Sequence, residues 1–138
     1  MFIKKDLRKV QEILEDPSDP RKTLKLGRRE AQFNGNISVL IDDKYRDALE
    51  SCEYLSLYNN KLDSIRGIHA FDGSPLESLN LGRNQLKTLP SGLGKLSSTL
   101  SSLWVEDNHI HGFPKVSNIN VAKFHLVVAL AFPLRCSR

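Results

Sequence analysis

The sequence has few cysteines, no long apolar segment and no signature of a known catalytic site. Its 138 residues include two cysteines, Cys52 and Cys136, which are too few for a disulfide framework, and no cysteine–histidine set has the spacing of a zinc site. The longest apolar run, residues 126–134, is too short to span a bilayer. No apolar segment precedes the charges of the first sixteen residues, as a secretory signal peptide would require. We therefore expect an intracellular, cytoplasmic protein.

The motifs of nucleotide binding, serine hydrolysis, zinc proteolysis and calcium binding are absent as well. The densest polar cluster places Glu106 and Asp107 close to His109 and His111. Two alternating histidines without a third ligand make a poor metal site. We therefore expect no enzymatic activity, no cofactor and no bound metal.

The net charge of +4 is concentrated at the two ends of the chain. Residues 1–30 carry nine basic and six acidic side chains, residues 31–114 carry seven and ten, and residues 115–138 carry four and none. The basic pI near 9.2 therefore reflects the ends and does not describe the middle of the chain. A nucleic-acid partner is not expected.

The middle of the chain repeats every twenty-four residues. Asn60, Asn84 and Asn108 stand at this spacing, and each closes one apolar pattern: C-x-x-L-x-L-x-x-N-x-L at 52–62, L-x-x-L-x-L-x-x-N-x-L at 76–86 and L-x-x-L-x-V-x-x-N-x-I at 100–110. The alternating apolar residues predict short strands that stack in parallel. An asparagine amide can both donate and accept, so a stacked column can satisfy the backbone of the turns that follow the strands.

A weaker copy one period upstream spans residues 28–51 and places Asn36 in the asparagine column. We therefore predict a structural asparagine ladder of Asn36, Asn60, Asn84 and Asn108. This register puts the Asn36 amide in the interior, so the glycosylation sequence Asn36-Ile37-Ser38 is interpreted as a chance match.

The pattern resembles the leucine-rich repeat, over residues 28–114. The best-matching stretch, LESLNLGRNQLKTLPSGLGKL, is similar to intracellular repeats of the plant Ras-group and Ras-suppressor type. The resemblance implies an α/β solenoid: a short horseshoe arc with a parallel β-sheet on its concave side and an N-terminal helical cap. It also implies a protein-interaction scaffold or adaptor, with a role in signalling. A regulatory subunit of a phosphatase or GTPase pathway is an alternative, as is a truncated or mispredicted fragment without activity of its own.

The repeats divide the chain into three parts. Residues 1–27 hold a capping helix and a linker, because Ile3, Leu7, Val10, Ile13 and Leu14 fall on one helical face. Residues 28–114 hold the repeats: 28–51 (degenerate), 52–75, 76–99 and 100–114 (partial). Residues 115–138 form a C-terminal cap or a tail outside the repeats. The alternatives for this tail are a strand or helix over the last repeat, a basic and apolar anchor for a membrane or partner, and an intron read-through product.

Strand residues that point away from the core form the predicted binding site. The register gives four outward columns: Glu30, Tyr54, Ser78 and Ser102; Gln32, Ser56, Asn80 and Trp104; Asn34, Tyr58, Gly82 and Glu106; Gly35, Asn59, Arg83 and Asp107. Tyrosine, tryptophan and arginine are enriched in protein interfaces. We predict that another protein binds to Tyr54, Tyr58, Asn80, Arg83, Trp104, Glu106 and Asp107. The alternative is that these side chains only shield the short sheet.

Overall fold

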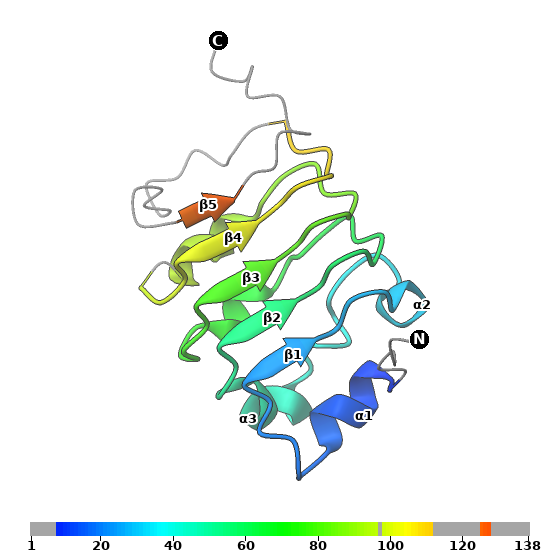
Figure 1. Cartoon of the computed structure of the whole chain (residues 1–138), viewed down its shortest axis with the longest axis vertical. Helices are drawn as coiled ribbons and strands as arrows, with labels where there is room; N and C mark the ends of the chain where they lie inside the picture. The colour runs from blue at the N-terminus through cyan, green and yellow to red at the C-terminus, as the bar shows by residue number, and fades with distance from the viewer. Residues whose placement is uncertain (1–7, 97, 112–124, 128–138) are drawn as a thin grey trace, which may run out of the picture.

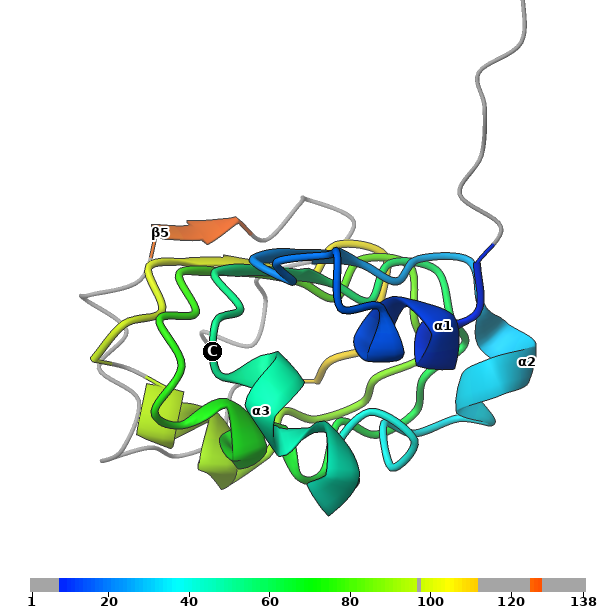
Figure 2. The ribbon, with the colours of Figure 1, turned by 90° about the horizontal axis from the view of Figure 1, so that it is seen from below.

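The computed structural model describes residues 8–96, 98–111 and 125–127, and within them a single parallel sheet organises the chain (Figure 1). Its strands lie in sequence order: β1 (Thr23–Lys25), β2 (Tyr54–Ser56), β3 (Ser78–Asn80), β4 (Ser102–Trp104) and β5 (His125–Val127). The helical elements are α1 (Val10–Glu15), α2 (Glu30–Phe33), η1 (Asp43–Tyr45), α3 (Arg46–Leu49), η2 (Ile68–Phe71) and η3 (Ser91–Leu96). The helical turns lie on one side of the sheet (Figure 2). The result is a solenoid in which each turn adds one strand.

Alternation along each strand decides which side chains are buried. The central residues Leu24, Leu55, Leu79 and Leu103 are at most 1% exposed, while the flanking strand residues, apart from buried Ser56, keep contact with solvent. Ile68 and Phe71 of η2 and Leu93 and Leu96 of η3 close the interior from the opposite side. One continuous core runs from Val10 to Ile110, because no single turn can bury its apolar residues without its neighbours.

Asparagine amides connect successive turns beyond the ends of the strands. The Asn84 side chain donates to the carbonyl oxygens of Leu57 (3.0 Å) and Leu81 (2.9 Å), and its oxygen accepts from the backbone N–H groups of Asn60 (2.9 Å) and Leu62 (3.0 Å). Asn60 and Asn108 make equivalent bonds one turn earlier and one turn later. Each amide thus satisfies backbone groups of its own turn and of the turn before it.

The first turn differs from the prediction for residues 28–51. Strand β1 lies at Thr23–Lys25, within the predicted linker, and pairs Thr23 with Tyr54, an offset of 31 residues, whereas the β2–β3 and β3–β4 pairs have an offset of 24. The predicted place of Asn36 in the ladder is wrong: Asn36 is exposed, and its side chain accepts from Ser38. The longer connection between β1 and β2 shifts the register, so that residues 30–35 follow the strand and do not belong to it.

Arg29 occupies the ladder position that the sequence assigned to Asn36. Its backbone N–H donates to the Asn60 side-chain oxygen, as the N–H of Asn60 does to Asn84. The guanidinium is buried and donates to the carbonyl oxygens of Lys25 (3.0 Å), Gly27 (2.9 Å) and Arg8 (2.8 Å). The first member of the ladder is therefore an arginine, whose longer side chain reaches three backbone acceptors.

Helix α1 adds its apolar face to the same core. Val10, Ile13 and Leu14 are buried there, and the Tyr45 hydroxyl donates to the Glu15 carboxylate (3.0 Å). Burial and this contact with Glu15 raise the pKa of Tyr45. The predicted helix residues Ile3 and Leu7 lie outside the described residues.

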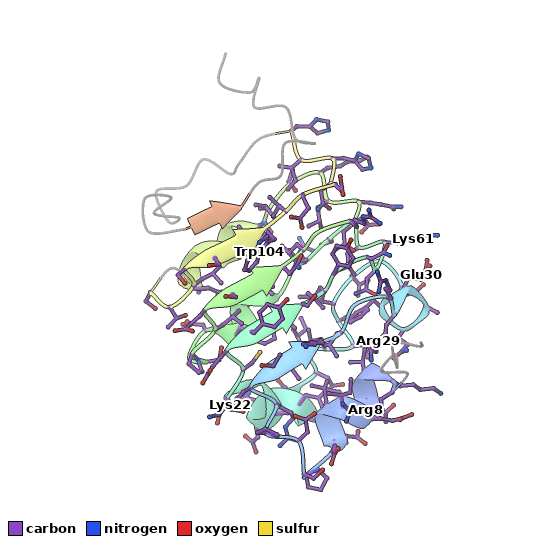
Figure 3. All side chains as sticks on the ribbon, in the orientation of Figure 1. Arg8, Lys22, Arg29, Glu30, Lys61 and Trp104 are labelled. Carbon is purple, nitrogen blue, oxygen red and sulfur yellow. The ribbon has the colours of Figure 1, made fainter. Side chains whose placement is uncertain are left out.

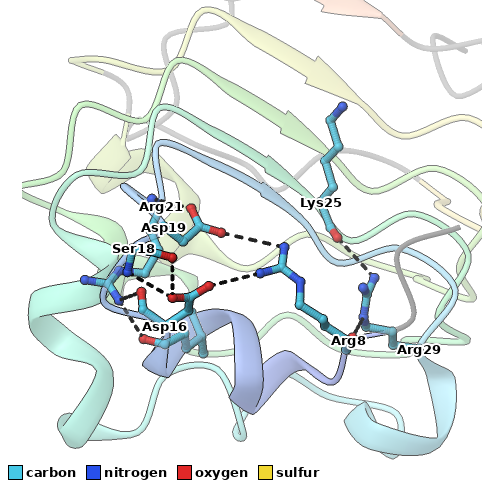
Figure 4. A network of polar contacts seen from close by, with 8 residues as sticks. Arg8, Asp16, Ser18, Asp19, Arg21, Lys25 and Arg29 are labelled. Atoms are coloured by element: carbon cyan, nitrogen blue, oxygen red, sulfur yellow. Dashed lines mark hydrogen bonds and ion pairs between the residues drawn. The ribbon is translucent and has the colours of Figure 1, made fainter. Parts of the chain in front are cut away.

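A polar network holds the segment between α1 and β1 (Figure 4). Arg21 donates to the carbonyl oxygens of Leu14 (3.1 Å) and Asp16 (2.9 Å) at the end of the helix, where backbone acceptors lack intrahelical partners. The Arg8 guanidinium pairs with Asp16 (3.4 Å) and Asp19 (3.7 Å). Hydrogen bonds from Ser18, and to a lesser degree the charges of Arg8 and Arg21, lower the pKa of Asp16.

Three residues of the predicted C-terminal segment extend the sheet. Strand β5 pairs in parallel with β4, with Ser102 opposite His125 and Trp104 opposite Val127. The remaining predictions for the tail concern residues outside the described part of the chain, as do those for residues 112–114 of the last repeat.

Candidate functional site

One face of the sheet carries the outward side chains of the strands, and we call it the strand face. Figure 2 shows that the helical turns lie on the opposite side of the sheet, and Figure 3 shows Trp104 on β4. Of the predicted binding residues, the structure places Tyr54, Asn80 and Trp104 on β2, β3 and β4, each partly exposed. Asn80 stands opposite Trp104 in the register. Three polar or aromatic side chains of neighbouring strands therefore share this face.

The other predicted residues lie in the turns that follow the strands. Tyr58 is partly exposed, and the Arg83 guanidinium carbon lies 5.9 Å from the centre of its ring. Arg83 in turn pairs with Asp107, with 3.5 Å between Nε and Oδ2. The structure thus brings Tyr58, Arg83 and Asp107 into one row across three turns.

Arg28 belongs to the same row, although the 24-residue pattern did not predict it there. Its guanidinium carbon lies 5.8 Å from the centre of the Tyr58 ring, and its backbone N–H donates to the Tyr58 carbonyl oxygen. The residues predicted for this turn do not lie on the strand face, because β1 precedes them in the chain; they are Glu30, Gln32, Asn34 and Gly35. The residues that occupy the four positions are Thr23, Lys25, Gly27 and Arg28. The Leu24-x-Leu26 alternation was the signal that could have located this strand.

Arg28, Asn59, Arg83 and Asp107 share an unusual backbone conformation. Their φ angles are 58°, 58°, 54° and 56°, in the left-handed region that residues other than glycine seldom adopt. The backbone therefore turns away from each strand in the same way, and it projects the four side chains in a column along one edge of the strand face. Because the conformation recurs in the turns after β1, β2, β3 and β4, the spacing of this column is regular.

The acidic end of the face is formed by Glu106 and Asp107. Glu106 reaches across Gly82, where a β-carbon would clash with its carboxylate oxygen. Partial burial, and secondarily the charge of Asp107, raise the pKa of Glu106. The absence of a side chain at Gly82 therefore lets a carboxylate lie against the sheet beside the row that Tyr58 and Arg83 form.

The described residues hold three further candidate groups: the histidines after β4, a cysteine and a cleft. His109 and His111 are exposed, and no group of three or more histidine, cysteine, aspartate or glutamate side chains is placed to hold a metal in residues 8–96, 98–111 and 125–127. Cys52 is fully buried in the leucine column, and burial raises the pKa of its thiol to about 12, so it is a poor nucleophile. A cleft of about 720 Å³ lies between the α3 and η2 segments, with Asp43, Arg46 and Asp72 in its lining.

Comparison with known protein families finds a match to one turn of the chain. Residues 75–96 match the model of the Leucine Rich Repeat family, over the turn that contains β3, Asn84 and η3. This match supports a leucine-rich repeat protein, because the same arrangement of strand and asparagine recurs in the turns of Asn60 and Asn108. Modules of this class generally bind other proteins. No curated protein and no solved structure matches the chain.

Among the helices of the described ranges, none is both long enough and apolar enough to cross a bilayer.

Proposed function

We propose that this chain is an intracellular protein-interaction scaffold or adaptor, which acts in signalling and binds its partner through the strand face. The carrying observation is the row formed by Arg28, Tyr58 and Arg83, next to the partly exposed aromatic rings of Tyr54 and Trp104. Partly exposed aromatic side chains surrounded by charged ones are typical of an interface with an apolar centre and a polar rim. The binding residues are Tyr54, Tyr58, Asn80, Arg83, Trp104, Glu106 and Asp107.

The repeat scaffold supplies a rigid surface for this role. Buried leucines fix the position of each strand, and the ladder amides fix the turn that follows it. Side chains held in place by such a scaffold lose little conformational freedom when a partner binds. We further propose that the strands form a short horseshoe arc whose concave side is the strand face, and that α1 caps its first turn through Val10, Ile13 and Leu14. In this proposal the cap and linker end before β1, and the repeats extend to residue 114.

A pull-down from source-cell lysate, analysed by mass spectrometry, tests the function. The bait is the whole chain, and the test variant is Tyr58→Ala/Trp104→Ala. The matched control is His69→Ala/Lys95→Ala, which changes two exposed residues of η2 and η3 on the opposite side of the sheet. All three proteins must melt alike by circular dichroism.

We expect a protein that the parent and the control retain and that the test variant loses. Its identity would also distinguish an adaptor from a regulatory subunit of a phosphatase or GTPase pathway. Equal recovery with the test variant would reject the strand face as the binding site. A parent chain that does not melt cooperatively would favour the truncated-fragment alternative.

A further inference from the structure

Basic and acidic groups are separated along the strand face. Lys25 and Arg28 lie in the first turn and are exposed, whereas Glu106 and Asp107 lie in the turn of β4. Figure 4 shows the Lys25 side chain directed away from the polar network, while its backbone carbonyl accepts from Arg29. Within the described part of the chain, neither Lys25 nor Arg28 forms an ion pair with a carboxylate. The two cations are therefore exposed to solvent and have no counter-charge among the described residues.

Tyr58 holds two guanidinium groups at similar distances, 5.8 Å for Arg28 and 5.9 Å for Arg83. A guanidinium over an aromatic ring is attracted through its face, and the N–H donors in its plane remain available. Glycines occupy the positions equivalent to Tyr58 in the neighbouring turns, Gly27 and Gly82, so no side chain from either position competes for the space. The Tyr58 ring thus lies close to two arginines, which come from the turns before and after its own.

The Arg83 guanidinium remains accessible to a ligand although it pairs with Asp107. Its pair with Asp107 spans 3.5 Å, and the two side chains are 58% and 48% exposed. An exposed pair of this kind binds weakly, because water and salt screen the charges. A ligand carboxylate can therefore compete with Asp107 for Arg83, and no carboxylate of the described residues pairs with Arg28.

We propose that the strand face takes an acidic segment of the partner protein, with a carboxylate bound between Arg28 and Arg83 beside Tyr58 and a second one near Lys25. Arginine pairs carboxylates through two parallel hydrogen bonds, which favours this geometry over a diffuse attraction. A nucleic acid fits less well, because its continuous row of phosphates would meet Glu106 and Asp107 at the other end of the face. This inference rests on the proposed function, since it names the chemistry of the partner at the same face.

Fluorescence anisotropy with a labelled glutamate decapeptide tests the proposal on the whole chain. The first pair of variants is Arg28→Glu and its control Arg46→Glu, which reverses an exposed arginine of α3 outside the strand face. We expect Arg28→Glu to weaken binding by about tenfold or more, the usual effect of losing a charge-assisted hydrogen bond, and Arg46→Glu by less than about twofold. Equal weakening by both variants would overturn the site, because it would show a response to net charge alone.

A second pair of variants predicts a gain and so does not depend on a loss of folding. Asp107→Ala frees Arg83, whereas Asp43→Ala frees Arg46 and changes the net charge equally. We expect Asp107→Ala to tighten binding by about threefold and Asp43→Ala to leave it within about twofold. Equal affinities for the two variants would contradict competition at Arg83.

A thymidine decanucleotide of similar length serves as the alternative anion. Tighter binding of the oligonucleotide than of the peptide would overturn the choice of an acidic protein segment, as would the absence of saturable peptide binding. The pull-down separates this inference from the proposed function. If the captured protein is lost by Tyr58→Ala/Trp104→Ala but kept by Arg28→Glu, the protein-binding face stands and the anion site is wrong. If the peptide binds as expected and no captured protein depends on Tyr58 and Trp104, the anion site stands and the proposed function fails.

Discussion

The first turn and the later turns of this solenoid meet the same structural requirement with different residues. In the later turns, Asn60, Asn84 and Asn108 donate to backbone carbonyls of their own turn and of the one before. In the first turn Arg29 stands in this position, and it reaches the carbonyl of Arg8 just ahead of α1. A repeat with a neighbour on both sides can use a short amide, whereas the first repeat must bond to a segment with a different geometry. The terminal repeat of an array therefore uses a residue that suits the segment it contacts, and this residue differs from the one used in the inner repeats.

The largest effect should come from removing an amide in the middle of the ladder. Asn84→Ala leaves several buried backbone groups without a partner, and each costs about 1–3 kcal/mol, so we expect a loss of about 3 kcal/mol or more in the free energy of unfolding. Asn36→Ala is the matched control and should cost about 0.5 kcal/mol or less, because Asn36 is exposed. Urea unfolding of both variants measures the difference. Similar losses would show that Asn36 belongs to the ladder after all.

A smaller effect is expected at the first turn. Arg29→Ala removes three hydrogen bonds to carbonyls near the N-terminal end of the sheet, where water can replace part of them, and should cost about 2 kcal/mol. Arg29→Asn should cost about half as much, because an amide at this position can bond within its own turn as Asn84 does. Urea unfolding again measures both. If the asparagine variant is no more stable than the alanine variant, Arg29 stabilises the fold mainly through its hydrogen bond to the Arg8 carbonyl oxygen.

Next in size is a pH effect confined to the later turns. The pKa of Glu106 is raised in the folded state, so its ionised form destabilises the fold at neutral pH, and stability returns as the pH falls through that pKa. Glu106→Gln should therefore stabilise the protein at pH 7, by less than about 1 kcal/mol because the group is largely solvated. This advantage should shrink on acidification. Thermal melts between pH 4 and pH 7, with Glu77→Gln as an exposed control, measure this stability gain. A gain that does not change with pH would contradict the raised pKa of Glu106.

The smallest effect concerns a direct link between the two regions. Glu30 of the first turn pairs with Lys61 of the second at 3.1 Å, with side chains 54% and 65% exposed (Figure 3). A double-mutant cycle with alanine should give a coupling energy below about 0.5 kcal/mol, because exposed ion pairs contribute little. A coupling above about 1 kcal/mol would show that this pair helps to hold the first turn against the others.

The regular turns could be predicted well because their period is constant. The 24-residue spacing of Asn60, Asn84 and Asn108 located β2, β3 and β4, and with them the outward positions of Tyr54, Asn80 and Trp104. Strand β1 was missed because the connection to β2 is longer, and a fixed period then assigns every column of the first turn to the wrong residue. The error removed Arg28 and Lys25 from the predicted face and placed Asn36 in a ladder where Arg29 stands.

By itself, the sequence determined that this chain stacks short parallel strands over a leucine core, since a periodic apolar pattern has few other ways to bury its residues. Only the tertiary structure decided where the first strand lies and which residue opens the ladder. It also decided that Arg28 and Arg83, 55 positions apart in the numbering, lie 5.8 and 5.9 Å from the centre of one tyrosine ring. The physical reason is that hydrogen bonds between turns fix the register of the strands. The residues that can form these bonds depend on the length of each connection, and a periodic sequence pattern does not reveal a connection of different length.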